Sequence, residues 1–184
     1  MKIETHGRWP LVAAVAVAPV TVAAVRRPGL RPLAALLLHQ TEEWVWPGGF
    51  LPWMNCEVLG SGEDEFPLDP RMGLVINVGL GWGTSLGTMA GRRAAAPSAF
   101  LYVSHLGNVA LHLQWAIRHR RYDPGLLTAL LTLAPAAAIG LRALHADPEV
   151  SHGALAAGTV AGAASSVALP PLLRRRWRRG RPSQ

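Results

Sequence analysis

Cysteine, aromatic residues and charged residues are all scarce in this sequence, and each shortage argues against a particular kind of bond, site or protein class. The single cysteine, Cys56, excludes an internal disulfide and fits no metal site that needs several cysteines. Aromatic residues make up 7% of the chain, which is thin for a cavity that stabilises carbocations with ring faces. Only 16% of the residues are charged whereas half are hydrophobic, and this balance predicts a helical membrane protein.

Six apolar segments are long enough, or almost long enough, to cross a bilayer. They are 9–25, 31–46, 72–91, 97–118, 124–145 and 151–173. We therefore expect an all-α, polytopic transmembrane helix bundle of about six membrane helices (five to six), formed by residues 1–184 as a single membrane domain. No convincing small-residue cleavage site follows the first segment, so we expect a retained helix there and not a signal peptide. The loop 47–71 is either a solvated connection or a lid.

The distribution of basic residues predicts the orientation of the chain. With six crossings and both termini in the cytoplasm, twelve of the 18 lysines and arginines lie at cytoplasmic ends, six of them in the tail 174–184. Since lysine and arginine favour the cytoplasmic side, we expect a multi-pass protein of the cell (inner) membrane with both termini cytoplasmic. The net charge of +7 then suits anionic lipid headgroups, and we expect membrane lipids, not nucleic acid, as partners.

The third apolar segment carries a face of small residues at four-residue spacing, formed by Gly79, Gly83, Gly87 and Gly91. Small residues let a second backbone approach a membrane helix closely. We expect this face to pack inside the protein, and a homo-oligomer interface is the alternative. A shorter face of the same kind in the sixth segment is formed by Gly158 and Gly162.

The segment His39-Gln40-Thr41-Glu42-Glu43 follows directly on an apolar run, where charge is unfavourable. Even the lower scales place the cost of one charged side chain at the bilayer centre at roughly 2.5–3.5 kcal/mol. We therefore expect the cluster to be used and not merely buried. On a helix, His39, Glu42 and Glu43 fall on one stripe, because offsets of three and four residues bring side chains together.

A second polar stripe lies on the fourth apolar segment, where His105, Asn108 and His112 share one helix face. In the six-helix topology the second and fourth segments run in the same direction. At 1.5 Å per residue, His39 and His105 each lie about 12 Å below the outer boundary, and Glu43 and Asn108 lie at roughly 16–18 Å. Polar groups from separate helices thus fall at similar depths, which predicts a single intramembrane site.

Imidazole nitrogens and carboxylate oxygens suit a divalent metal, iron or zinc, and a cation would also neutralise buried glutamates. We expect His39, Glu43 and His105 to bind this metal. The expected catalytic residues are Glu42, Glu43, His112 and Asn108. Because His105 and His112 are about 10.5 Å apart along the helix axis, one of them would contact substrate or support a ligand, or two ions would be present. A structural role as hydrogen-bonding contacts between helices remains open for the histidines and Asn108.

The five residues from His39 to Glu43 match the motif that names the HXXEE family of small bacterial integral membrane proteins, and the chain resembles this family. The helix with His105 and His112, continuing into Arg120-Arg121-Tyr122-Asp123-Pro124-Gly125-Leu126, is similar to the second half of the family. The resemblance covers about residues 30–144 and leaves the first helix and the tail 174–184 outside. It implies a multi-helix membrane protein with a polar core. The family is largely uncharacterised, so it implies no catalytic residues.

From these residues we expect an integral membrane enzyme whose intramembrane His/Glu metal site acts on a lipophilic small-molecule substrate. Iron would favour oxidation, and zinc would favour hydrolysis by a bound water. Two other classes remain open. One is a metal-free cyclase or isomerase of a prenyl or sterol-like substrate, with Glu42 or Glu43 as general acid or base. The other is a small transporter or assembly factor whose buried carboxylates bind a proton or a metal in transit.

Overall fold

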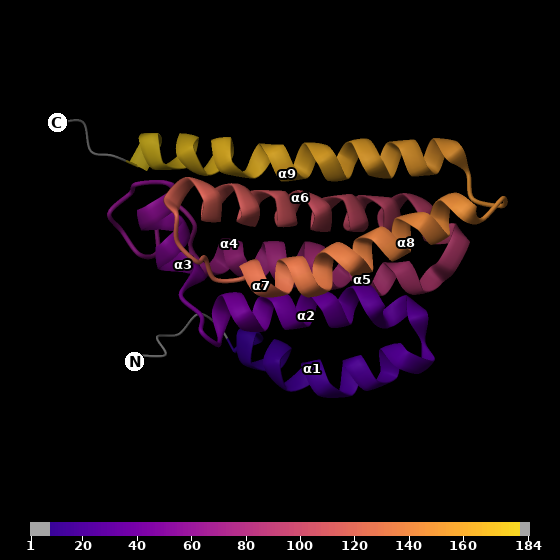
Figure 1. Ribbon diagram of the computed structural model, residues 1–184. Coiled ribbons are helices and arrows are strands. Elements are labelled where there is room, and N and C mark those ends of the chain that lie inside the picture. The colour runs from indigo at the N-terminus through magenta and orange to yellow at the C-terminus, as the bar shows by residue number, and fades with distance from the viewer. Residues whose placement is uncertain (1–7, 181–184) are drawn as a thin grey trace.

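The computed structural model describes residues 8–180, and every regular element within that range is a helix. Two helix pairs form the body of the bundle. α1 (Trp9–Arg26) turns through η1 (Pro28–Leu30) and packs along α2 (Arg31–Trp44), while α6 (Ala95–His119) packs along α9 (His152–Gly180). Figure 1 shows the two pairs one above the other, with their helices roughly parallel to one long axis. The expected all-α bundle is therefore confirmed.

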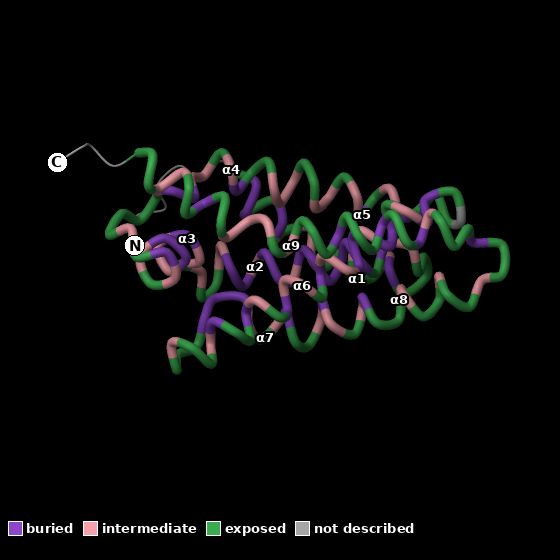
Figure 2. Tube along the Cα trace, turned by 90° about the horizontal axis from the view of Figure 1, so that it is seen from above, coloured by how far each residue is buried: buried purple, intermediate pink, exposed green. Residues whose placement is uncertain are grey.

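A first side rod connects the two pairs along one edge of the bundle (Figure 2). It consists of α4 (Pro70–Leu74), the π-helical η3 (Val75–Trp82) and α5 (Gly83–Gly87), and η4 (Thr88–Ala94) leads from it into α6. Asp69 starts the rod, because its carboxylate accepts the backbone N–H of Met72 at 2.8 Å. Gly91, with a φ of 61°, allows the chain to turn back toward α6.

The second side rod runs along the opposite edge and places α2 at the centre of the molecule (Figure 2). It consists of α7 (Leu126–Thr128), the π-helical η5 (Ala129–Leu133) and α8 (Ala134–Ala146). α2 packs against α1 and against both side rods, so that ten of its 14 residues are buried. The polar side chains of His39, Gln40, Glu42 and Glu43 therefore lie in the interior of the bundle and not on its surface.

Three helical stretches are long and apolar enough to cross a membrane: Trp9–Arg26, Leu126–Ala146 and His152–Gly180. Each of them carries exposed large apolar side chains, among them Val15 at 79%, Leu131 at 66% and Val167 at 72% exposed. Extended apolar surface of this kind needs an apolar environment to cover it. These helices indicate a membrane protein.

We expected about six membrane helices, but only three helices in the described part of the chain are long and apolar enough to cross a membrane. The second apolar segment forms only the 14-residue α2, and the third is divided among α4, η3 and α5. α6 is continuous over 25 residues, but His105, Asn108 and His112 are among the polar residues that lower its mean hydropathy. The prediction was too high because apolar composition alone does not show where a helix is short or interrupted.

The loop between α2 and the first side rod closes one end of the bundle. It contains α3 (Phe50–Pro52) and the π-helical η2 (Trp53–Val58), and it buries Leu51, Met54 and Leu68 in one apolar cluster with side chains of α6 and α9. The fully buried Asn55 holds the loop together, since its amide donates to the Leu68 carbonyl at 2.8 Å and accepts the Leu68 N–H at 2.9 Å. The loop is thus a packed cover over this end of the bundle.

The two glycine faces behave differently. Within residues 8–180, nothing lies within 4 Å of a Cβ built at any position of the first face, Gly79, Gly83, Gly87 and Gly91, so the expected internal packing there is wrong. On α9, by contrast, a Cβ at Gly162 would lie 2.6 Å from the Phe100 carbonyl oxygen of α6. The close internal contact is therefore made by the α9 glycines, and the first face is not covered by another described element.

Replacing Gly158 by alanine is expected to loosen the packing of α9 on α6. The new Cβ would meet the Ala96 carbonyl oxygen and lie 2.8 Å from the Ala99 Cβ, and a backbone atom cannot give way cheaply. If overpacking costs about 1–2 kcal/mol, the Tm in detergent falls by roughly 2–8 °C. Gly79→Ala is the matched control, because its Cβ meets no neighbour. Equal Tm values for both variants and the wild type would contradict this contact.

Candidate functional site

Three buried side chains from α2 and α6 meet at the centre of the bundle. His39 and Glu43 are one helical turn apart on α2, and His112 faces them from α6. The Oε1 atom of Glu43 lies 3.3 Å from Nε2 of His39 and 3.4 Å from Nε2 of His112. One ligand atom from each residue can be chosen so that all three lie within 4.8 Å of one another. We refer to these three residues as the His/Glu/His cluster.

Hydrogen bonds fix the orientation of the His39 ring. Its Nδ1 lies 3.1 Å from Thr128 Oγ1, and its Nε2 lies 2.8 Å from the amide nitrogen of Asn108. Because the Asn108 amide donates, Nε2 of His39 keeps its lone pair and Nδ1 carries the proton that Thr128 accepts. The Thr128 hydroxyl in turn donates to Glu42. In this arrangement His39 is a neutral imidazole whose lone pair is on Nε2, where it accepts the Asn108 N–H and lies beside Glu43.

Asp123 holds the second imidazole. Its Oδ1 lies 2.6 Å from Nδ1 of His112, and both side chains are fully buried. This contact turns Nε2 of His112 toward Glu43, in the way that carboxylates commonly orient the histidine ligands of metals. We did not single out Asp123 from the sequence, although a signal was present: it is the only acidic residue between Asp69 and Asp147.

Gly125 packs directly against the His/Glu/His cluster. A Cβ at this position would lie 2.8 Å from Glu43 Cγ, 2.8 Å from His112 Cε1 and 2.9 Å from His39 Cε1. Its φ of 106° is also a conformation that side chains disfavour. Only glycine therefore lets the backbone of this loop approach all three side chains at once.

Glu42 has a different environment from Glu43. Its carboxylate accepts the backbone N–H groups of Thr128 at 2.7 Å and Leu127 at 3.2 Å, and the hydroxyls of Thr128 and Tyr122. Burial, followed by the bond to Glu42, raises the pKa of Tyr122, so its hydroxyl stays protonated and donates. These bonds attach the start of the second side rod to α2, which favours a structural role for Glu42 over the expected catalytic one.

A cavity of about 260 Å³ adjoins the His/Glu/His cluster. His39, Glu43, Asn108 and His105 all line it, among mainly apolar side chains from α2, the first side rod, α6 and α9. His105 is not part of the cluster, and neither of its ring nitrogens has a hydrogen-bond partner among the residues that the structure describes. Of the expected metal ligands, the structure brings His39 and Glu43 together and places His112, not His105, beside them.

The register of α2 against α6 explains this exchange of histidines. Asn108 lies level with His39, to which it is hydrogen-bonded. His112, one turn further along α6, is then level with Glu43, and His105 lies about one turn away in the other direction. The polar residues converge from α2 and α6, as expected. Each α2 residue, however, lies level with an α6 residue about one turn further along than expected.

Comparison with known proteins places the cluster within a family. Residues 32–139, more than half of the chain, match the family model described as a protein of unknown function with HXXEE motif. The match includes the His/Glu/His cluster together with Asp123 and Gly125, and it leaves α1 and α9 outside. No curated protein and no solved structure matches the chain. The resemblance seen in the sequence is confirmed, and the chain belongs to the HXXEE family.

Proposed function

We propose that the protein is an integral membrane enzyme in which His39, Glu43 and His112 bind one divalent metal ion, iron or zinc. The observation that carries this proposal is the convergence of two imidazole Nε2 atoms on one carboxylate oxygen, at 3.3 and 3.4 Å. In a tetrahedral site, ligand atoms about 2.0–2.1 Å from the ion lie about 3.4 Å from each other. Two of the three pairs of candidate ligand atoms therefore already have the spacing of a ligand set.

The surroundings of the cluster support a catalytic role over a purely structural one. Three protein ligands leave at least one coordination position for water or substrate, and His39 and Glu43 face the cavity where a substrate would lie. Two histidines and one carboxylate serve both in hydrolytic zinc sites and in non-haem iron sites. Zinc would supply an acidic bound water for hydrolysis, whereas iron would supply oxidation.

We propose a lipophilic substrate that enters the cavity sideways from the bilayer. Half of the lining residues have apolar side chains, and the lining includes Leu80 of the first side rod and Ser165 of α9, both of which are exposed. An opening between these two elements faces outward from the bundle. In a membrane, such an opening would connect the cavity with lipid and not with water.

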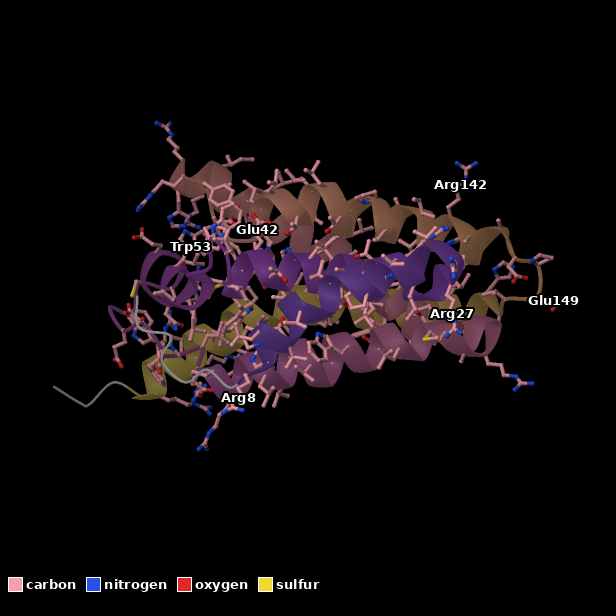
Figure 3. All side chains as sticks on the ribbon, turned by 90° about the horizontal axis from the view of Figure 1, so that it is seen from below. Arg8, Arg27, Glu42, Trp53, Arg142 and Glu149 are labelled. Carbon is pink, nitrogen blue, oxygen red and sulfur yellow. The ribbon has the colours of Figure 1, made fainter. Side chains whose placement is uncertain are left out.

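The proposed location is the inner membrane, with both termini cytoplasmic. Figure 3 shows Arg8 toward one end of the bundle and Arg27, Arg142 and Glu149 toward the other. α9 ends at the same end of the bundle at which α1 begins (Figure 1). α2, α6 and the first side rod lie beside the three apolar stretches and would share their depth. This placement, together with the bias of arginines to one side, supports an even number of crossings.

One contact supports a metal-free acid–base site as a second candidate. His112 is bonded to Asp123 through Nδ1 and faces Glu43 through Nε2, so the three groups form a chain along which a proton can move. In this version Glu43, which lines the cavity, is the group that reacts with substrate, since Glu42 is held by four donors.

Elemental analysis of the detergent-purified protein tests the metal directly. We expect about one equivalent of iron or zinc in the wild type, and its loss in His39→Ala and in His112→Ala. His105→Ala and His145→Ala are the matched controls and should keep the metal, because neither residue belongs to the cluster. Each variant must elute as a monodisperse, helical species. A metal-free wild type, or equal loss in all four variants, would sink the metal proposal and favour the acid–base alternative.

Asp123 should control how tightly the metal is bound. Removing the carboxylate in Asp123→Ala leaves the His112 ring unoriented, and loss of such a partner typically weakens metal binding 10- to 100-fold. We expect an intermediate loss in Asp123→Asn, which keeps the shape and an acceptor but removes the charge. Competition against a chelator measures the affinity. The remote acid Asp147 provides the control as Asp147→Ala; a loss there equal to that in Asp123→Ala would show a general effect of acid removal.

A further inference from the structure

His105 is a buried polar side chain without a hydrogen-bond partner in the described range 8–180. Only 5% of its surface is exposed, and neither ring nitrogen bonds to any residue of that range. A buried imidazole loses its bonds to water, so leaving both nitrogens unpaired is unfavourable. Because His105 also lines the cavity beside the His/Glu/His cluster, the missing partner belongs to whatever occupies that cavity.

The chemistry of His105 selects the kind of group that it can bind. A neutral imidazole has one N–H donor and one lone pair, and a hydroxyl group also both donates and accepts. A carboxylate would bring a second negative charge into the cavity that Glu43 already lines. An ester or ketone oxygen accepts but cannot donate. A hydroxyl is therefore the best match to His105.

The rest of the cavity is suited to a hydrocarbon chain. Leu36, Phe100, Leu101 and Leu169 are among its apolar lining residues, and Ser104 and Ser165 bond to each other at 3.1 Å. Its volume of about 260 Å³ is just below the usual range for ligand sites of about 300–1,000 Å³. A long chain would therefore fit only in part and extend through the opening beside Leu80 and Ser165.

We infer that the substrate is a lipophilic alcohol whose hydroxyl is held by His105, while another part of the molecule reaches His39 and Glu43. His105 and His112 are two turns apart on α6, about 10.5 Å along its axis, which separates the held group from the metal centre. His105 is thus a binding residue and not a ligand of the ion. The inference depends on the proposed function, because it makes the alcohol the substrate of that centre.

Photolabelling of the full-length protein in phosphatidylcholine nanodiscs tests the inference. Three probes of equal chain length carry the same diazirine: a primary alcohol, a hydrocarbon and a carboxylate. We expect the alcohol to label cavity residues about three- to tenfold more than the hydrocarbon, the range that one hydrogen bond provides. Unlabelled hexadecanol should compete for this labelling, and hexadecane should compete poorly.

Two variants separate the hydrogen bond from general packing. His105→Phe keeps a flat ring but cannot bond to a hydroxyl, so we expect equal labelling by alcohol and hydrocarbon and an unchanged metal content. His145→Phe is the matched control, because His145 is exposed on α8 and bonds to the Leu141 carbonyl outside the cavity. It should keep the wild-type preference for the alcohol.

Several results would overturn the inference. They are equal labelling by alcohol and hydrocarbon in the wild type, an alcohol preference that survives in His105→Phe, or loss of metal in His105→Phe, which would make His105 a ligand. A wild type that prefers the alcohol but contains no metal would instead refute the proposed function and support the alcohol site. The two failures are therefore distinguishable.

Discussion

The structure depends on placing two adjacent carboxylates inside a helix bundle. Neighbouring residues of a helix point about 100° apart, so Glu42 and Glu43 must be neutralised by different elements. Glu42 accepts hydrogen bonds from the free N–H groups at the start of the second side rod, and Glu43 contacts the imidazoles of His39 and His112. The loop between α6 and α7 serves both, since Tyr122 donates to Glu42, Asp123 holds His112 and Gly125 covers the cluster. The position of this loop follows from the two glutamates.

The rest of the motif holds α2 to its other neighbours. Gln40 accepts the indole N–H of Trp82 at 2.7 Å and donates to Asn77 at 3.0 Å, which joins α2 to the first side rod. Thr41 bonds back to the Leu37 carbonyl of its own helix. Glu42 joins α2 to the second side rod, and within the motif His39, Gln40 and Glu43 line the cavity. A motif of five residues therefore provides two tertiary attachments, through Gln40 and Glu42, and places His39 and Glu43 beside the cavity.

Helical periodicity was sufficient to predict that α2 and α6 present polar stripes to each other, but not their register. A shift of one turn, about 5.4 Å, brings Asn108 level with His39 in place of His105, and brings His112 level with Glu43 in place of Asn108. The loops and the bond between Asn108 and His39 set that shift. Asp123 was missed because its function depends on a loop conformation, which no periodic pattern reveals. The open side of the glycine face was equally hidden, because spacing shows that a face exists and not what lies against it.

Charge balance provides a reason to prefer the metal over the acid–base alternative. The centre contains two carboxylates, Glu43 and Asp123, and two imidazoles, of which His39 is held neutral by its hydrogen bonds. With both imidazoles neutral the buried charge is two negative units, and one divalent cation cancels it. Without the cation, a proton on Nε2 of His112, which faces Glu43, would cancel only one of these two negative units. A centre balanced in this way has no charge left to attract an anionic substrate, which agrees with an uncharged hydroxyl at His105 and with entry from lipid.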